Sequence, residues 1–136
     1  MNAYLSHALE LMAHLRSILL AIGNAEQIPN EDHTLFLERF DTLITELGEY
    51  SETAMGDGQE IIVQIFHRYP QIAHLIPRDL MWFFGGDCLH YMPDEEIALY
   101  QELEERRFIA EEQNHAFNWP LERNLLFMQR SEHRLH

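Results

Sequence analysis

The sequence predicts an all-α protein: a single-domain, irregular bundle of five to seven helices with little or no strand. Apolar residues recur every three or four positions along most of the chain, which is the helical period. Glycines and prolines separate these stretches, and no pair of stretches alternates in a way that would build a sheet. With 136 residues and 46% hydrophobic residues, residues 1–136 can form one domain with a core.

The first predicted helix covers residues 3–22 and ends at Gly23 and Asn24, which stop helices. Arg16 lies at the edge of its apolar face and is expected to extend toward water or to pair with a carboxylate. The apolar face comprises Leu5, Ala8, Leu11, Met12, Leu15, Ile18, Leu19 and Ile22.

A linker containing Pro29 leads to a second predicted helix, residues 31–54, with a narrow apolar seam. Such a seam fits an antiparallel neighbour or a partner chain. Gly56 and Gly58 are expected to break the helix, and Asp57 with Glu60 matches a capping box that would begin a third helix through Tyr69. Residues 61–66 are rich in β-branched side chains, which favour strands, but the cap and the lack of a pairing strand favour helix. The seam residues are Phe36, Phe40, Leu43, Leu47 and Tyr50.

Residues 69–93 are the most unusual segment, with three of the five prolines and the one cysteine. Pro70 and Pro77 are expected to begin short helices over 70–76 and 77–84, followed by a turn. The segment should cross the bundle and close its core. Its aromatic residues fill the core or form an interaction surface; they are Trp82, Phe83, Phe84 and Tyr91.

Two further helices are predicted, one from Pro93 to about Gln113 and one from about Asn118 to Gln129. Residues 129–136 form a basic tail that suits an acidic surface of the same chain or of a second subunit. The tail and the seam of the second helix together indicate a homodimer.

The charge of the chain excludes several functions. It has 23 acidic and 9 basic residues, for a net charge of −14, and every basic residue is an arginine. This field repels nucleic acids and anionic membranes and attracts cations or a basic protein partner. Without lysine, neither Schiff-base chemistry nor a P-loop lysine is available.

The sequence also suggests a cytoplasmic protein. No apolar run approaches the roughly 18 residues of a membrane span, and no export signal is recognised at the N-terminus. A single cysteine cannot form an internal disulfide.

The sharpest cluster of reactive residues is Asp87, Cys88 and His90, with His74 and Asp79 nearby. A cysteine beside a histidine can be an activated nucleophile, and these residue types can also bind zinc. Residues two apart on a tight turn seldom point at each other, however, and a cysteine among aromatics is usually a small buried hydrophobe. The sequence favours burial, so no catalytic residue is assigned.

Two other patterns can be compared with metal sites. His7, Glu10 and His14 share one helical face, and Glu112 with His115 matches one Glu-x-x-His motif of di-iron bundles. Di-iron sites need a second such motif, which is absent from the sequence, and a solvated helix face explains the first pattern. No cofactor is expected.

The block Trp82-Phe83-Phe84-Gly85-Gly86-Asp87-Cys88-Leu89-His90, with Tyr69-Pro70-Gln71-Ile72-Ala73-His74 before it and Met92-Pro93-Asp94-Glu95-Glu96-Ile97 after it, resembles a family of short, all-helical, uncharacterised bacterial proteins. The resemblance covers most of the chain. It implies a stand-alone cytosolic bacterial protein and carries over no catalytic or binding residue.

The leading functional hypothesis is a small acidic protein that acts through protein–protein contacts as an interaction or regulatory module. A metal-binding protein or metal-dependent enzyme that uses His, Glu and Asp is the first alternative. A thiol-reactive protein that uses Cys88 is the second.

Overall fold

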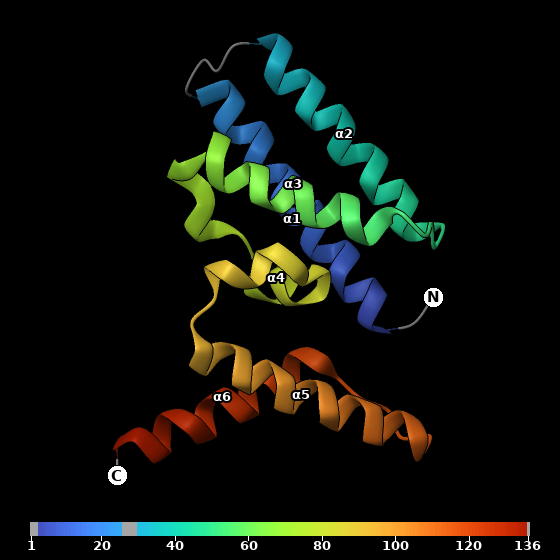
Figure 1. Cartoon of the computed structure of the whole chain (residues 1–136), viewed down its shortest axis with the longest axis vertical. Coiled ribbons are helices and arrows are strands. Elements are labelled where there is room, and N and C mark those ends of the chain that lie inside the picture. Colours follow the sequence, from blue (N-terminus) through green and yellow to red (C-terminus); the bar gives the residue numbers. More distant parts are fainter. Residues whose placement is uncertain (1–2, 26–29, 136) are drawn as a thin grey trace. The chain divides into compact units, whose positions relative to one another are not determined.

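The chain is all-α, as the sequence predicts. The computed structural model describes residues 3–25 and 30–135, with the side chains of residues 25, 30 and 131–135 excepted. Within these ranges there are six α-helices, two short 3₁₀ helices and no strand (Figure 1). The elements are α1 (Ala3–Ala25), α2 (Asn30–Gly48), α3 (Ala54–Arg68), η1 (Pro70–Leu75), α4 (Arg78–Phe84), η2 (Gly86–Tyr91), α5 (Asp94–Glu112) and α6 (Trp119–Leu135).

The helices form two compact units. The N-terminal unit is Met1–His90 and the C-terminal unit is Tyr91–His136. The prediction that residues 1–136 form one domain stays a prediction. The linker predicted around Pro29 lies outside the described residues.

The core of the N-terminal unit is built from the faces that the apolar pattern marks. α1 lies beside α2, α3 packs on α2, and α4 contacts both α1 and α3 (Figure 1). The predicted seam is buried in this core except for Tyr50, which lies beyond the end of α2, so α2 uses the seam against helices of its own chain. Buried core residues of the three long helices include Met12, Leu15, Leu19, Phe36, Phe40, Leu43, Ile62 and Ile65.

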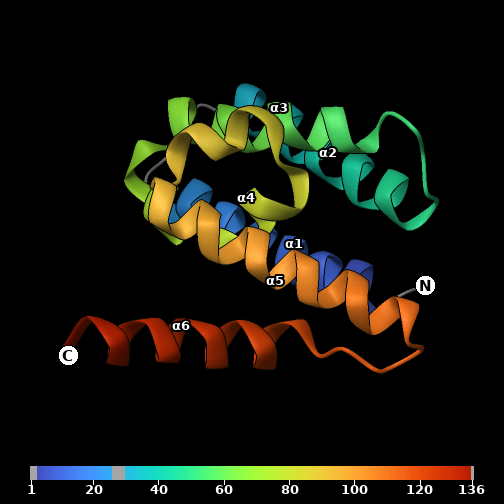
Figure 2. The same ribbon diagram turned by 60° about the horizontal axis from the view of Figure 1, so that its bottom comes forward.

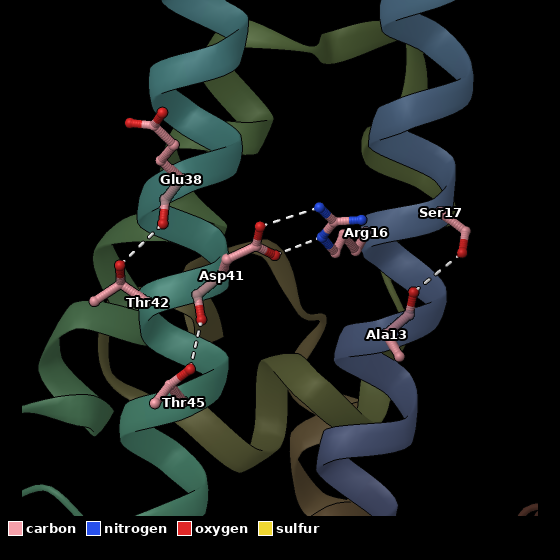
Figure 3. Close-up of polar contacts among 7 residues, drawn as sticks. All are labelled: Ala13, Arg16, Ser17, Glu38, Asp41, Thr42 and Thr45. Atoms are coloured by element: carbon pink, nitrogen blue, oxygen red, sulfur yellow. Dashed lines mark hydrogen bonds and ion pairs between the residues drawn. The ribbon is translucent and has the colours of Figure 1, made fainter.

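An ion pair joins α1 to α2 on the outside of this core. The guanidinium of Arg16 donates two hydrogen bonds to the carboxylate of Asp41, with Nη2 at 3.0 Å from Oδ2 (Figure 3). The hydrogen bond and charge of Asp41 raise the pKa of Arg16 above its ordinary value. The expected carboxylate partner of Arg16 is therefore confirmed.

The end of α2 differs from the prediction, which placed it at residue 54. The amide of Ser51 donates to the carbonyl of Glu46, and the amide of Tyr50 donates to that of Leu47. These bonds form a Schellman motif, in which Tyr50 has the left-handed φ of 59° that glycine usually supplies. The helix ends here because this motif satisfies its last carbonyls.

The break predicted at Gly56 and Gly58 is wrong, because both glycines lie inside α3. The N-cap of α3 is Thr53 and makes no side-chain capping bond, so the capping box of Asp57 and Glu60 is also wrong. Asp57 instead lies in the first turn of α3. There a carboxylate is favoured by the helix dipole.

The segment after α3 forms η1, α4 and η2, and its buried residues extend the core of the N-terminal unit up to Cys88. Pro70 is the first residue of η1, whereas Pro77 is the N-cap of α4 instead of its first residue. Gly85 and Gly86 have φ values of 66° and 55°, which explains the paired glycines at the turn into η2. η2 replaces the turn predicted for residues 87–92.

The C-terminal unit is the helix pair α5 and α6, shown in orange and red in Figure 2. α5 ends in a second Schellman motif with Asn114 at φ 55°, and the side chain of Asn118 accepts from the amide of Leu121 to begin α6. Between the helices, the ring of Tyr100 stacks on Trp119 and meets the edge of Phe127.

The predicted end of the last helix at Gln129 is wrong, because α6 continues to Leu135.

Arg130 of α6 donates a hydrogen bond of 3.2 Å to the carboxylate of Glu102 on α5. This hydrogen bond, together with one from Arg106, lowers the pKa of Glu102. The side chains of the predicted basic tail beyond Arg130 lie outside the described part.

The expectation about membrane spans needs a correction for α1. By length and composition, the stretch Ala3–Asn24 is apolar enough to cross a membrane, even with Glu10 and Arg16 in it. The core helix of a soluble protein and a signal sequence meet the same criterion. One face of α1 is buried against its own chain.

Candidate functional site

The residues of the cysteine cluster point in different directions. The thiol of Cys88 is fully buried and lies 3.8 Å from the carbonyl oxygen of Gln59, to which it can donate. Asp87 and His90 are exposed, 3.7 Å apart on the outside of η2, and His74 is exposed as well. Burial, and then the charge of Asp87, raise the pKa of Cys88 to about 11. The arrangement lacks the exposed, low-pKa thiol of a nucleophilic cysteine.

We expect Cys88 to resist alkylation at pH 8 in the native protein, reacting at least about 100-fold more slowly than in denaturant, since its pKa rises from 9.0 to about 11. Mass spectrometry after iodoacetamide treatment measures this directly, because the chain has one cysteine. The control is the same protein in guanidinium. Native labelling at the denatured rate would revive the thiol-reactive alternative.

Asp79 is a buried acidic side chain of the N-terminal unit. It lies in the first turn of α4 with 2% of its surface exposed, and His7 of α1 donates to its Oδ2 from Nε2 at 2.8 Å. The sequence placed His7 on the polar side of its helix and Asp79 beside the cysteine cluster. The structure brings the two together as a partly buried contact between α1 and α4 and leaves Cys88 out of it.

The metal-site candidates are spread over the surface. Glu10 and His14 are exposed, and His7 points to Asp79; Glu112 and His115 are exposed at the end of α5 and in the loop after it. Among the described residues, no three His, Cys, Asp or Glu side chains lie close enough together to hold a metal ion. The metal alternative stays a hypothesis that elemental analysis of the purified protein can test.

The four aromatic residues assigned to an interaction surface are all at least partly covered. Phe84 is buried, whereas Trp82, Phe83 and Tyr91 are half-buried. The ring of Phe83 meets the edges of Tyr4 and Phe84 at 5.3 and 5.2 Å between centroids. Phe84 therefore packs inside the N-terminal unit and is not available for a contact at its surface.

A buried histidine–tyrosine pair was not found from the sequence. Nδ1 of His33 and the hydroxyl of Tyr69 are hydrogen-bonded at 3.0 Å, and burial raises the pKa of Tyr69. The ring of His33 lies directly against Gly23 of α1, where a side chain would overlap it. The signal was available, because His33 precedes Phe36 and Phe40 by three and seven residues and so shares their buried face.

Three exposed apolar side chains of the C-terminal unit lie on α6. Leu121, Leu125 and Met128 are 52%, 44% and 58% exposed. Their spacing of four and three residues places them on one face of the helix, which we call the α6 stripe. Phe108 and Ile109, near the end of α5, are also more than half exposed. Exposed apolar residues grouped in this way mark contact surfaces.

Two surface hollows lie on the described part of the N-terminal unit. One, of about 270 Å³, lies near the α2–α3 turn and is lined mostly by apolar residues, among them Tyr4, Tyr50, Met55 and Phe83. The other, of about 520 Å³, lies between α2 and α3 and has a mixed lining that includes Leu35, Glu46 and Asp57. Sequence periodicity could not reveal either one, because each forms between elements.

A protein-family model described as PA2817-like matches residues 1–135 of the chain. No curated protein and no solved structure matches it.

Proposed function

The chain belongs to the PA2817-like family, and we propose that it acts as an interaction module whose first partner is a second copy of itself. The observation that carries this proposal is the α6 stripe. Its three side chains are too exposed to be core residues and follow one another along a single helix face. Burying them against the same stripe of another copy removes apolar surface from water on both chains.

The charge of α6 supports this choice of partner. α6 contains three arginines and two glutamates, whereas the whole chain has a net charge of −14. α5 contains eight acidic and two basic residues. Two strongly acidic chains repel each other least where each presents its more basic helix. A two-fold contact through α6 also makes a closed dimer, the commonest form of homo-oligomer.

The stripe is short, so the dimer should be weak, with a dissociation constant on the order of 100 μM. Such an affinity suits a regulatory protein whose assembly follows its concentration. Self-association of this kind extends the hypothesis of a protein–protein interaction module to a defined surface.

Replacing Leu125 with glutamate is expected to raise the dissociation constant of the dimer at least tenfold. The substitution places a carboxylate in the centre of the stripe that dimer formation would bury. Sedimentation velocity over a range of concentrations measures the change. The matched control is Leu20→Glu, since Leu20 on α1 has a similar exposure of 39%. A wild-type protein that stays monomeric at millimolar concentration, or equal effects of both substitutions, would contradict the proposal.

A further inference from the structure

The groove between α2 and α3 combines an apolar base with an acidic edge. It has a volume of about 520 Å³ and is lined by Leu43 and Ile61, which are buried, and by Leu35, which is 59% exposed. Leu35 therefore offers apolar surface to an incoming molecule. A hollow of this size can hold several side chains of a ligand.

Carboxylates outnumber cations along the groove. Glu38 and Glu46 line it from α2, and Asp57 lines it from α3. Loss of hydration, the charge of Asp57 and a hydrogen bond to Asp57 raise the pKa of Glu46, so the two carboxyl groups lie close together. The one arginine in the lining, Arg39, lies 3.8 Å from Glu60 and donates to Gln64. The positive charge of Arg39 is thus already paired with the carboxylate of Glu60 beside the groove.

We propose that this groove binds a short cationic amphipathic helix of a partner protein. Apolar side chains of the partner would pack mainly on Leu35, the exposed apolar residue of the lining, and its arginines or lysines would lie beside Glu46 and Asp57. Charge complementarity carries the choice of partner, since the groove and the whole chain are acidic. A groove between two helices fits the helix-in-groove mode of peptide recognition.

The groove and the α6 stripe lie in different units and would bind different partners, so peptide binding shares with the proposed function only the premise of protein contacts. Glu46 and Asp57 are remote in sequence from the α6 stripe, so loss of one property leaves the other testable. Peptide binding should be the same in the Leu125→Glu variant, and self-association should be the same in groove variants.

The probe is a fluorescein-labelled peptide of about 14 residues, with leucines at helical spacing on one face and arginines on the other. Fluorescence anisotropy at physiological salt measures its affinity. The expected result is binding that weakens at least tenfold in the double variant Glu46→Gln/Asp57→Asn. The control is Glu10→Gln/Glu112→Gln, which removes two exposed carboxylates outside the groove and should change affinity less than about twofold.

A peptide of the same composition with its leucines and arginines scrambled separates recognition from plain charge attraction. Weaker binding of the scrambled peptide supports the groove. Equal binding of both peptides, equal losses in both double variants, or no binding at millimolar peptide would overturn the proposal. Circular dichroism of each variant verifies that a loss of binding does not come from unfolding.

Discussion

Replacing Gly58 with alanine is expected to lower the free energy of unfolding of the N-terminal unit by about 2 kcal/mol. Gly58 lies inside α3, and a methyl group there would overlap the ring of Phe84 from α4. Phe84 is buried, so its ring cannot move aside freely. The clash outweighs the roughly 1 kcal/mol that alanine gains over glycine in a helix. Urea unfolding followed by circular dichroism measures the change.

Gly56 provides the matched control, because it lies in the same helix with nothing near the position of an added methyl group. Gly56→Ala should therefore stabilise the protein by roughly 0.5–1 kcal/mol. The two substitutions change the same residue type, two positions apart, with opposite signs. If both stabilise the protein, the close packing of α3 on α4 at Gly58 is wrong.

Replacing Asp79 with alanine is expected to cost about 3 kcal/mol of unfolding free energy. Asp79 is buried and bonded to His7, so alanine removes a contact between α4 and α1 and leaves a small void. Asp79→Asn should cost less, because an amide oxygen keeps the shape and can still accept from His7. Thermal and urea unfolding of both variants measure the difference.

The control for Asp79 is Asp87, an exposed aspartate that also lies beside a histidine. Asp87→Ala should change stability by less than about 0.5 kcal/mol, since exposed ion pairs contribute little. Similar small effects at both aspartates would mean that the partly buried His7–Asp79 contact does not hold α1 to α4.

The helical architecture could be predicted from the sequence because apolar period and burial agree. On α1, the residues of the predicted apolar face include Met12, Leu15 and Leu19, all fully buried. The β-branched run of α3 is helical as expected, with Ile61, Ile62 and Ile65 buried. The spacing of the apolar residues predicts the buried face correctly, because a helix in a bundle must bury one face.

Helix ends were predicted less well, for two physical reasons. Glycine is the usual signal for the left-handed residue after a helix, but α2 uses Tyr50 and α5 uses Asn114. The glycines that do look like a break, Gly56 and Gly58, are helical. Gly58 is accounted for by the close approach of Phe84, which depends on tertiary packing and leaves no trace in the local pattern.

The candidate site residues were likewise predictable only where their position depends on local pattern and not on tertiary packing. The sequence favoured burial of Cys88, and the thiol is buried. The pairing of His7 with Asp79 could not be predicted, because the residues are 72 positions apart and only the packing of α4 on α1 brings them together. The α6 stripe follows a readable spacing of four and three residues. Which of its neighbours would be buried depends on how α6 packs on α5.

The pairing of helices in the N-terminal unit has a consequence for how the chain folds. Most contacts join helices that are close in sequence, such as α1 with α2, α2 with α3, and α3 with η1 and α4. Chains with such local topology lose little entropy in closing loops and fold rapidly. The contact of α1 with α4 spans the longest loop, so it should form late. The His7–Asp79 bond then governs the lifetime of the folded unit more than the speed at which it forms.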